Sequence, residues 1–483
     1  MMNGGSNSLV ITSMLAVGSC NDPETTPTTA GVETKLDVGS SKVDVGSKTL
    51  EVVQTPTPTS FLAISDVHYG KNAECCDYDE KSRGAYETCE TCLDLWTQAQ
   101  DQAKALIKAD EPGFIVYLGD LPAHNESRAN RTSEFGTVLD GLSDLVSGHP
   151  AIRLVYVPGN NDAVDGDYCG FTSRIHEYEK EYSKKTPFDY AKAPTDWPVI
   201  NGANDIIDSK HLAQGYYSVY PLGQGAKLRL IALNTVMFTD SYMAKGNCRG
   251  KEQNPQQTQT QDQMAWLDQQ LSDAENAKHK VILAMHVPPG LDGHDDTPTH
   301  MWSTELTYEN ENHEVEGLLD AFLGMVADAQ QQRTIVGILT AHTHENGIRR
   351  LFSCDDPSKF TALGVSVAAI TTDHGNKPSM KRFRYDSTSF ALLDDETYYA
   401  ASSTQGGWAA GQSFKFSGSY PCTKCPAGAS MHDRIATIGD ADTIVDDMLK
   451  VLTVRPGEVS KKHMYEQALD VCCGSKCDPG GLR

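Results

Sequence analysis

Two features are scarce in this sequence of 483 residues: positive charge and long apolar runs. Only 41 Lys and Arg oppose 65 Asp and Glu, so the formal net charge is −24 at pH 7. A general nucleic-acid binder needs a basic face, and this charge argues against one. No apolar run reaches the roughly 18 residues of a membrane-spanning helix, which excludes a multi-pass membrane protein. The composition, 39% hydrophobic and 22% charged, is that of a soluble globular protein.

Cysteine is plentiful by contrast: there are 13, an odd number and more than a reduced cytosolic enzyme usually holds. Residues 9–19 form an apolar stretch of signal-peptide length, although no Lys or Arg precedes it. The run Val17-Gly18-Ser19-Cys20 resembles a bacterial lipobox, in which the cysteine is lipidated. We therefore expect residues 1–20 to be a signal peptide or lipoprotein leader and the protein to be secreted or extracytoplasmic. A lipid anchor at Cys20 would be its one attachment to a membrane.

The rest of the chain divides into three regions. Residues 21–58 are rich in Thr, Pro and Ser and predict a flexible linker. From 59 to 395, buried strands alternate with amphipathic helices such as 93–109 and 261–277, a pattern typical of an α/β domain. The expected strands are 61–65, 114–118, 153–157, 228–233, 281–285 and 334–339. Residues 396–483 predict a small, partly helical C-terminal subdomain stapled by disulfides.

Polar side chains follow five of these strands, at the point where each strand ends. They are Asp66 and His68, Asp120, Asn160, His286, and His342 and His344. In open α/β sheets the carboxyl ends of strands form the ligand site, so we expect these side chains to converge. Imidazole, carboxylate and amide ligands suit Zn, Mn or Fe rather than a thiolate site. Seven ligands exceed one tetrahedral ion and fit two ions that share a bridging carboxylate.

The order Asp-x-His, Gly-Asp, Gly-Asn, His and His-x-His resembles that of the calcineurin-like metallophosphoesterases. Residues 119–125, 286–290 and 375–378 resemble the GD-x-PAH, H-x-PPG and GN-x-P stretches of the acid sphingomyelinase-like phosphodiesterase branch. The resemblance implies an α/β fold with a β-sheet sandwich flanked by helices. It also implies a binuclear metal centre that hydrolyses a phosphoester through a metal-bridging hydroxide.

The resemblance also assigns the ligands. Asp66, His68 and His344 would hold the first ion, Asn160, His286 and His342 the second, and Asp120 would bridge them. The chain departs from the family at Asn161, where a histidine normally contacts phosphate or donates a proton. Asn161 has no titratable proton, although its amide can hydrogen-bond a phosphoryl oxygen. We therefore expect His124 to act as the general acid, or else to orient the substrate.

Several substrates stay open at this stage: a phosphorylated small molecule such as a nucleotide, a phospholipid head group such as that of sphingomyelin, and polyphosphate. The segment 349–384 holds seven Lys and Arg against three Asp and predicts either a basic patch beside the site or a solvated face. A protein of another class, which binds metal without turnover, is the competing interpretation. The pairs Cys89-x2-Cys92 and Cys422-x2-Cys425 predict disulfides, with a zinc site as the alternative.

Overall fold

The computed structural model describes residues 58–75, 89–124, 126–171, 197–244, 248, 255–293, 299–331, 333–401, 407–408, 412–452, 454 and 462–474. The predicted leader, Cys20 and the predicted linker up to residue 57 lie outside the described residues. Within the described part of the chain, no helix is both long and apolar enough to cross a membrane.

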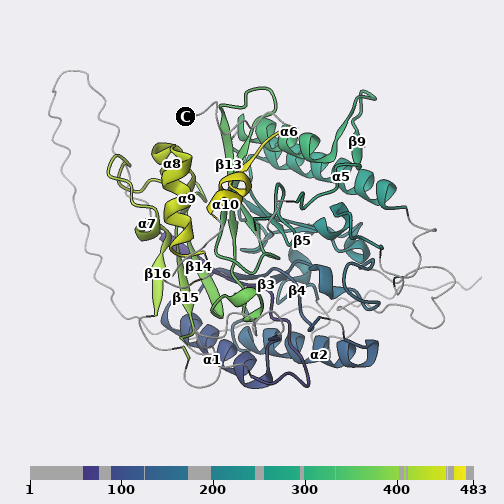
Figure 1. Ribbon diagram of the computed structural model, residues 1–483, viewed down its shortest axis with the longest axis vertical. Coiled ribbons are helices and arrows are strands. Elements are labelled where there is room, and N and C mark those ends of the chain that lie inside the picture. The colour runs from purple at the N-terminus through teal and green to yellow at the C-terminus, as the bar shows by residue number, and fades with distance from the viewer. Residues whose placement is uncertain are drawn as a thin grey trace, which may run out of the picture. The chain divides into compact units, whose positions relative to one another are not determined.

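Two β-sheets carry the fold (Figure 1). The first has the order β16 (Ser413–Lys415), β15 (Leu392–Tyr399), β14 (Ser379–Asp386), β1 (Pro58–Ile64), β2 (Phe114–Tyr117), β3 (Arg153–Tyr156), β4 (Val199–Ile200). The second has the order β17 (Asp470–Val471), β12 (Ile348–Phe352), β13 (Phe360–Ser366), β11 (Ile335–Thr340), β8 (Lys280–Met285), β7 (Leu228–Leu233), β6 (Tyr217–Val219), β5 (Ile206–Asp208). The central strands of each sheet are parallel. β9 (Thr307–Glu309) and β10 (Val315–Gly317) form a separate two-stranded sheet.

The sheets pack face to face because each central strand is apolar on both sides. In β1, Phe61 and Ala63 point into the core between the sheets, where they meet residues of the second sheet such as Leu230. The alternate residues Leu62 and Ile64 point to the outer face. A strand with apolar residues on both faces needs a second covering layer, and helices provide it.

Helices cover the outer face of each sheet. α1 (Leu93–Ala109) and α2 (Arg128–Leu145) lie on the first sheet, and α5 (Gln256–Ala277) and α6 (Leu318–Gln331) lie on the second (Figure 1). The buried residues of α1 recur every three or four positions, which places them on one stripe. Short 3₁₀ turns complete the described elements, at Asn160–Asp162, Ala203–Asp205, Leu212–Gln214, Thr235–Phe238 and Asp373–Gly375.

The C-terminal segment joins both sheets. It adds β16 to the first and β17 to the second, and β15 runs across residue 395, the predicted boundary of the C-terminal subdomain. Its helices are α7 (Phe416–Ser419), α8 (Met431–Ile438), α9 (Ala441–Leu449) and α10 (Lys462–Ala468). Apolar side chains of α8 and α9 enter the core between the sheets. The predicted fold class, a flanked β-sheet sandwich with a disulfide-rich, partly helical C-terminal part, is confirmed.

Disulfides link Cys75 to Cys92, Cys169 to Cys248, Cys354 to Cys473 and Cys422 to Cys425. Cys89 and Cys472 are disulfide-bonded as well. Both Cys-x2-Cys pairs are therefore oxidised, and the zinc interpretation of these pairs is wrong.

Candidate metal centre

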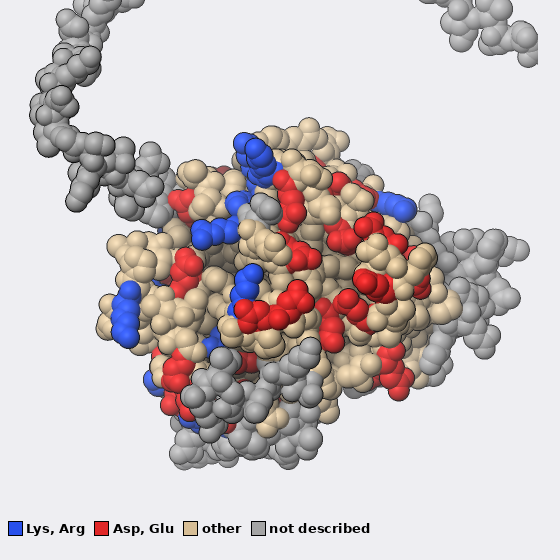
Figure 2. Space-filling model, turned by 90° about the horizontal axis from the view of Figure 1, so that it is seen from above, with Lys and Arg blue, Asp and Glu red and all other residues tan. Residues whose placement is uncertain are grey.

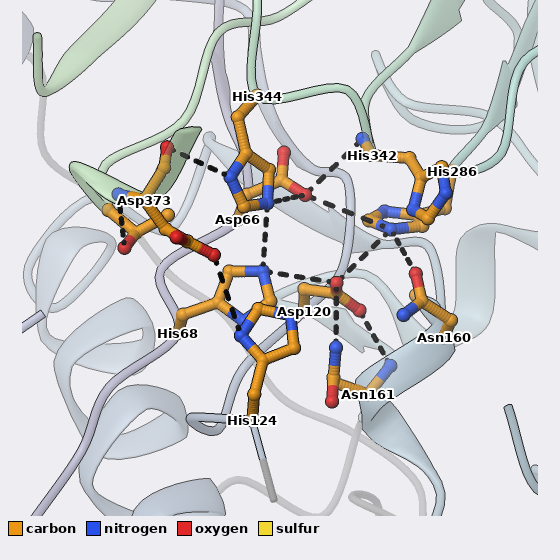
Figure 3. Close-up of polar contacts among 12 residues, drawn as sticks. Asp66, His68, Asp120, His124, Asn160, Asn161, His286, His342, His344 and Asp373 are labelled. Carbon is orange, nitrogen blue, oxygen red and sulfur yellow. Dashed lines mark hydrogen bonds and ion pairs between the residues drawn. The ribbon is translucent and has the colours of Figure 1, made fainter. Parts of the chain in front are cut away.

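The seven residues predicted from the strand ends meet at one place (Figure 3). Asp66 and His68 follow β1, Asp120 follows β2, Asn160 follows β3, His286 follows β8, and His342 and His344 follow β11. All but His342, which is partly exposed, are buried. The two sheets bring their carboxyl-end loops together because their inner faces pack against each other.

Two groups of ligand atoms share this place. Asp66, His68 and His344 place one atom each within 4.8 Å of one another, and Asp120, His286 and His342 do the same. Asp120 also reaches the first group, because its Oδ2 is 3.1 Å from His68 Nε2 as well as 3.3 Å from His286 Nε2. The Oδ1 atom of Asn160 is 3.0 Å from the same His286 nitrogen.

The backbone of this centre is strained. Asp66, His68, Asp120, His342 and His344 all adopt positive φ, between 45° and 71°. Such left-handed conformations cost about 1–3 kcal/mol for a non-glycine residue, and they cluster where function needs a fixed direction. Hydrogen bonds between the loops hold this conformation, for example from the amide of Asp66 to the Gly119 carbonyl at 2.9 Å. The ligand directions are thus fixed before any ion binds.

Two of the imidazoles are oriented from behind. His286 donates from Nδ1 to the Leu118 carbonyl at 2.6 Å, and His344 donates from Nδ1 to the Asp373 carbonyl at 3.3 Å. In the neutral rings, which are the forms that bind a cation, these bonds leave Nε2 as the lone-pair nitrogen that faces the centre. The Nε2 atoms of His344 and His68 are only 3.1 Å apart.

The sequence reasoning missed Asp162, which ties two loops of the centre together. Its carboxylate is fully buried and accepts from the backbone amides of Gly159 at 2.7 Å, Asp120 at 3.0 Å and Leu121 at 2.7 Å. These bonds fix the loop of Asp120 against the loop of Asn160. Its position directly after Asn160 and Asn161 was the sequence feature that could have indicated this supporting role.

Glu90 was missed as well. Its Oε1 accepts from the His124 backbone amide at 2.8 Å and contacts His124 Nδ1 at 2.8 Å. His124 is half-buried, and its ring stacks on that of His68 with centroids 4.2 Å apart. Glu90 arrives from the loop between β1 and α1, which the Cys75–Cys92 disulfide closes. Nothing in its sequence position indicates this contact.

The Asn161 side-chain amide, a possible donor to a phosphoryl oxygen, is directed at Asp120 in the structure. The residue is fully buried, its backbone amide donates to Asp120 Oδ1 at 2.8 Å, and its side-chain amide donates to Asp120 Oδ2 at 3.2 Å. The side chain is therefore directed at the carboxylate between the two ligand groups.

Burial and mutual charge shift the pKa values of the centre. Burial lowers the pKa of His68, but the nearby Asp120 carboxylate outweighs it and raises that pKa to about 10. The same opposition raises the pKa of His286 to about 9. Burial, and the Coulombic effect of His286, lower the pKa of His342 to about 3. Without metal, protons on His68 and His286 balance Asp120, and a bound cation would replace them.

The residues fit a pair of divalent cations. The Nε2 atoms of His68 and His344 face each other at 3.1 Å, a spacing that suits two nitrogen ligands of one cation. Among the described residues, the buried Oδ2 of Asp66 has no hydrogen-bond partner, and such an oxygen is costly unless it is coordinated. Nitrogen and oxygen ligands of this kind suit Zn, Mn or Fe.

Four of the seven basic side chains of the segment 349–384 are buried, whereas Lys359 is exposed and Lys377 and Arg384 are partly exposed. Arg350 pairs with Asp470 through two bonds of 2.6 and 2.7 Å, and Lys381 lies 3.1 Å from Asp395. Arg382 bonds to Asp110 at 3.3 Å. All three basic side chains are buried, so they are neither a steering patch nor a solvated face. On the face in Figure 2, Lys and Arg lie scattered, and Asp and Glu gather on one side.

Comparison with known proteins identifies the family of this chain. Residues 59–346 match the model of the calcineurin-like phosphoesterase family, and the chain belongs to that family. Its class is that of the metal-dependent phosphoester hydrolases, as the motifs predicted. Similar proteins include sphingomyelinase phosphodiesterase D of Dictyostelium discoideum, 25% identical over 60% of this chain and 56% of that protein. Others are human cyclic GMP-AMP phosphodiesterase SMPDL3A, 23% identical over 71% of each chain, and human acid sphingomyelinase-like phosphodiesterase 3b, 27% identical over 71% of each.

Proposed function

We propose that this protein is a secreted or surface-anchored phosphodiesterase of the acid sphingomyelinase-like branch, with two divalent cations in its active site. The observation that carries the proposal is the position of Asp120. One of its oxygens lies within 3.3 Å of histidines from both ligand groups, as a bridging ligand requires.

In this proposal the two ligand groups hold one cation each. Asp66, His68 and His344 bind the first, and Asn160, His286 and His342 bind the second, with Asp120 between them. Zinc is the leading metal, and manganese and iron are the alternatives that the same ligands accept. When bound, such cations supply Lewis acidity toward phosphoryl oxygens and acidify a water molecule.

The chain itself fixes the geometry of the reaction. Strained loops and the hydrogen bonds behind His286 and His344 hold the ligands in place, so little reorganisation is needed at the moment of reaction. Burial of the ligands keeps competing water away from most of the centre.

His124 is the proposed general acid. It stands next to His68, and the Glu90 carboxylate contacts its Nδ1, which turns the other ring nitrogen away from Glu90. We expect His124→Ala to slow a dialkyl phosphodiester, whose leaving group is poor, by about 10²–10⁴-fold, but a nitrophenyl diester far less. If the dialkyl ester is unaffected, the acid role is wrong and His124 only orients the substrate.

The substrate class follows from the relatives together with the site. Their names give sphingomyelin and cyclic GMP-AMP, which are both phosphodiesters, and this favours a diester over polyphosphate or a phosphomonoester. Four described disulfides favour an oxidising compartment, in agreement with the predicted leader.

One panel tests the proposal. The purified protein is freed of metal, reloaded with zinc or manganese, and assayed on bis-p-nitrophenyl phosphate, p-nitrophenyl phosphate, a cyclic dinucleotide, sphingomyelin, ATP and polyphosphate. We expect the diesters to be hydrolysed fastest and Asp120→Ala to be inactive on all of them. If the protein binds metal but hydrolyses neither diesters nor monoesters, it is a binding protein without turnover.

A further inference from the structure

We propose that Asn161 is a positioning residue that fixes the Asp120 carboxylate between the two ligand groups, and that it gives no proton and no contact to the substrate. This inference rests on the proposed function, because it concerns the carboxylate that would bridge the two cations.

Both oxygens of Asp120 are held by the same residue. The backbone amide of Asn161 donates to Oδ1 at 2.8 Å, and its side-chain amide donates to Oδ2 at 3.2 Å. Oδ2 is also the oxygen that lies 3.1 Å from His68 Nε2 and 3.3 Å from His286 Nε2. Two donors from one residue prevent the carboxylate from rotating, so this oxygen keeps facing both groups.

Asn161 is itself held from behind. Arg131, a buried arginine of α2, donates from its guanidinium to the Asn161 carbonyl. Asp162 clamps the adjoining backbone through Gly159 and Leu121. The Asn161 side chain thus has one available direction, and Figure 3 shows it pointing at Asp120 with its own oxygen turned away. The amide is fully buried, and its hydrogen bond is donated to Asp120.

The chemistry of an amide suits this task. An asparagine offers two N–H donors and carries no charge, so it can bond to a buried carboxylate oxygen at any pH without cancelling the charge that attracts a cation. Hydrogen-bond partners behind metal ligands typically contribute about 10–100-fold to metal affinity or activity. Asn161 therefore orients a ligand, and protonation of the leaving group falls to His124, the proposed general acid that stacks on His68.

The experiment compares Asn161→Ala, the smaller change Asn161→Ser, and the control Gln270→Ala. Gln270 is also a buried amide, bonded to Ser218 on the far face of the second sheet, so its loss reports only on the removal of a buried amide. Zinc affinity is measured by competition with a chromophoric chelator, and hydrolysis is measured on a nitrophenyl and a dialkyl diester. Thermal unfolding of the metal-free proteins shows whether each variant is folded. If Asn161→Ala does not fold, the comparison is made with Asn161→Ser instead.

We expect both Asn161 variants to bind zinc about 10–100-fold more weakly than the wild type and Gln270→Ala to bind it as the wild type does. At saturating zinc, the rates on the two diesters should fall by the same factor. The proposal is overturned if zinc affinity is unchanged, or if the dialkyl ester is slowed more than the nitrophenyl ester, because Asn161 would then serve the leaving group. If the wild type neither binds zinc nor hydrolyses a diester, the proposed function itself fails.

Discussion

Replacement of Asp162 by alanine should weaken the connection between two loops of the candidate metal centre, although it replaces none of the seven candidate ligands. The variant removes the acceptor of three backbone amides, those of Gly159, Asp120 and Leu121. Hydrogen bonds to a charged acceptor contribute about 1.5–3 kcal/mol each, so the three together contribute about 4.5–9 kcal/mol.

An opposing effect reduces this loss. Burial and the neighbouring Asp120 raise the pKa of Asp162 from 3.8 to about 6, so its ionised form is destabilised by about 3 kcal/mol at neutral pH. Removal of the carboxylate recovers that cost. We therefore expect Asp162→Ala to lower the free energy of unfolding of the metal-free protein by about 1.5–6 kcal/mol.

The assay is urea unfolding at pH 7, followed by tryptophan fluorescence and circular dichroism, together with zinc competition. Asp101→Ala on the exposed face of α1 is the matched control and should change stability by less than about 0.5 kcal/mol. Zinc affinity should also fall in Asp162→Ala, because the loops of Asp120 and Asn160 lose their link. A loss of stability below about 1 kcal/mol with unchanged zinc affinity would refute the reasoning.

Three further predictions concern metal, pH and disulfides. Removal of metal with a strong chelator should abolish hydrolysis and lower the melting temperature, and added zinc should restore both. A melting temperature that the chelator leaves unchanged would contradict the proposed metal centre. Burial raises the pKa of Glu134 to about 7, so the folded protein should lose about 1–2 kcal/mol from this group between pH 5 and 8. In urea unfolding, the free energy of unfolding of Glu134→Gln should fall less between pH 5 and 8 than that of the wild type. An equal fall in the two proteins would contradict the assignment. Replacement of Cys354 and Cys473 by serine removes a bridge with a sequence separation of 119 and should cost about 5 kcal/mol, whereas loss of the Cys422–Cys425 bridge, with a separation of 3, should cost about 2 kcal/mol or less. Equal losses in urea unfolding would contradict this order.

The strands and the ligands were predictable from the sequence for a local reason. A continuous apolar run such as 228–233 fits a strand buried on both faces, and the structure places β7 at Leu228–Leu233. The predicted helix 93–109 is α1, and the predicted helix 261–277 lies within α5. Residues that end parallel strands lie at one edge of their sheet, so the ligand types and their order indicated the seven candidates. The candidates come from two sheets, β1, β2 and β3 in one and β8 and β11 in the other, so the packing of the sheets was also needed to bring them together.

The contacts behind the ligands were not predictable in this way. Glu90 reaches His124 across 34 residues, and the orientation of Asn161 toward Asp120 depends on the direction of one side chain. The charges of 349–384 illustrate the same limit, because a count of Lys and Arg cannot tell a surface patch from buried pairs such as Arg350 and Asp470.

The sequence by itself determined the class of protein, six central strands with two of the helices that cover them, and the ligand types of its centre, because each of these depends on residues close together in the chain. Tertiary structure alone decided which side chains support those ligands and where the charges lie. Packing joins residues far apart in the chain and sets how deeply each is buried, and burial decides whether a carboxylate or an arginine faces solvent or holds a loop in place.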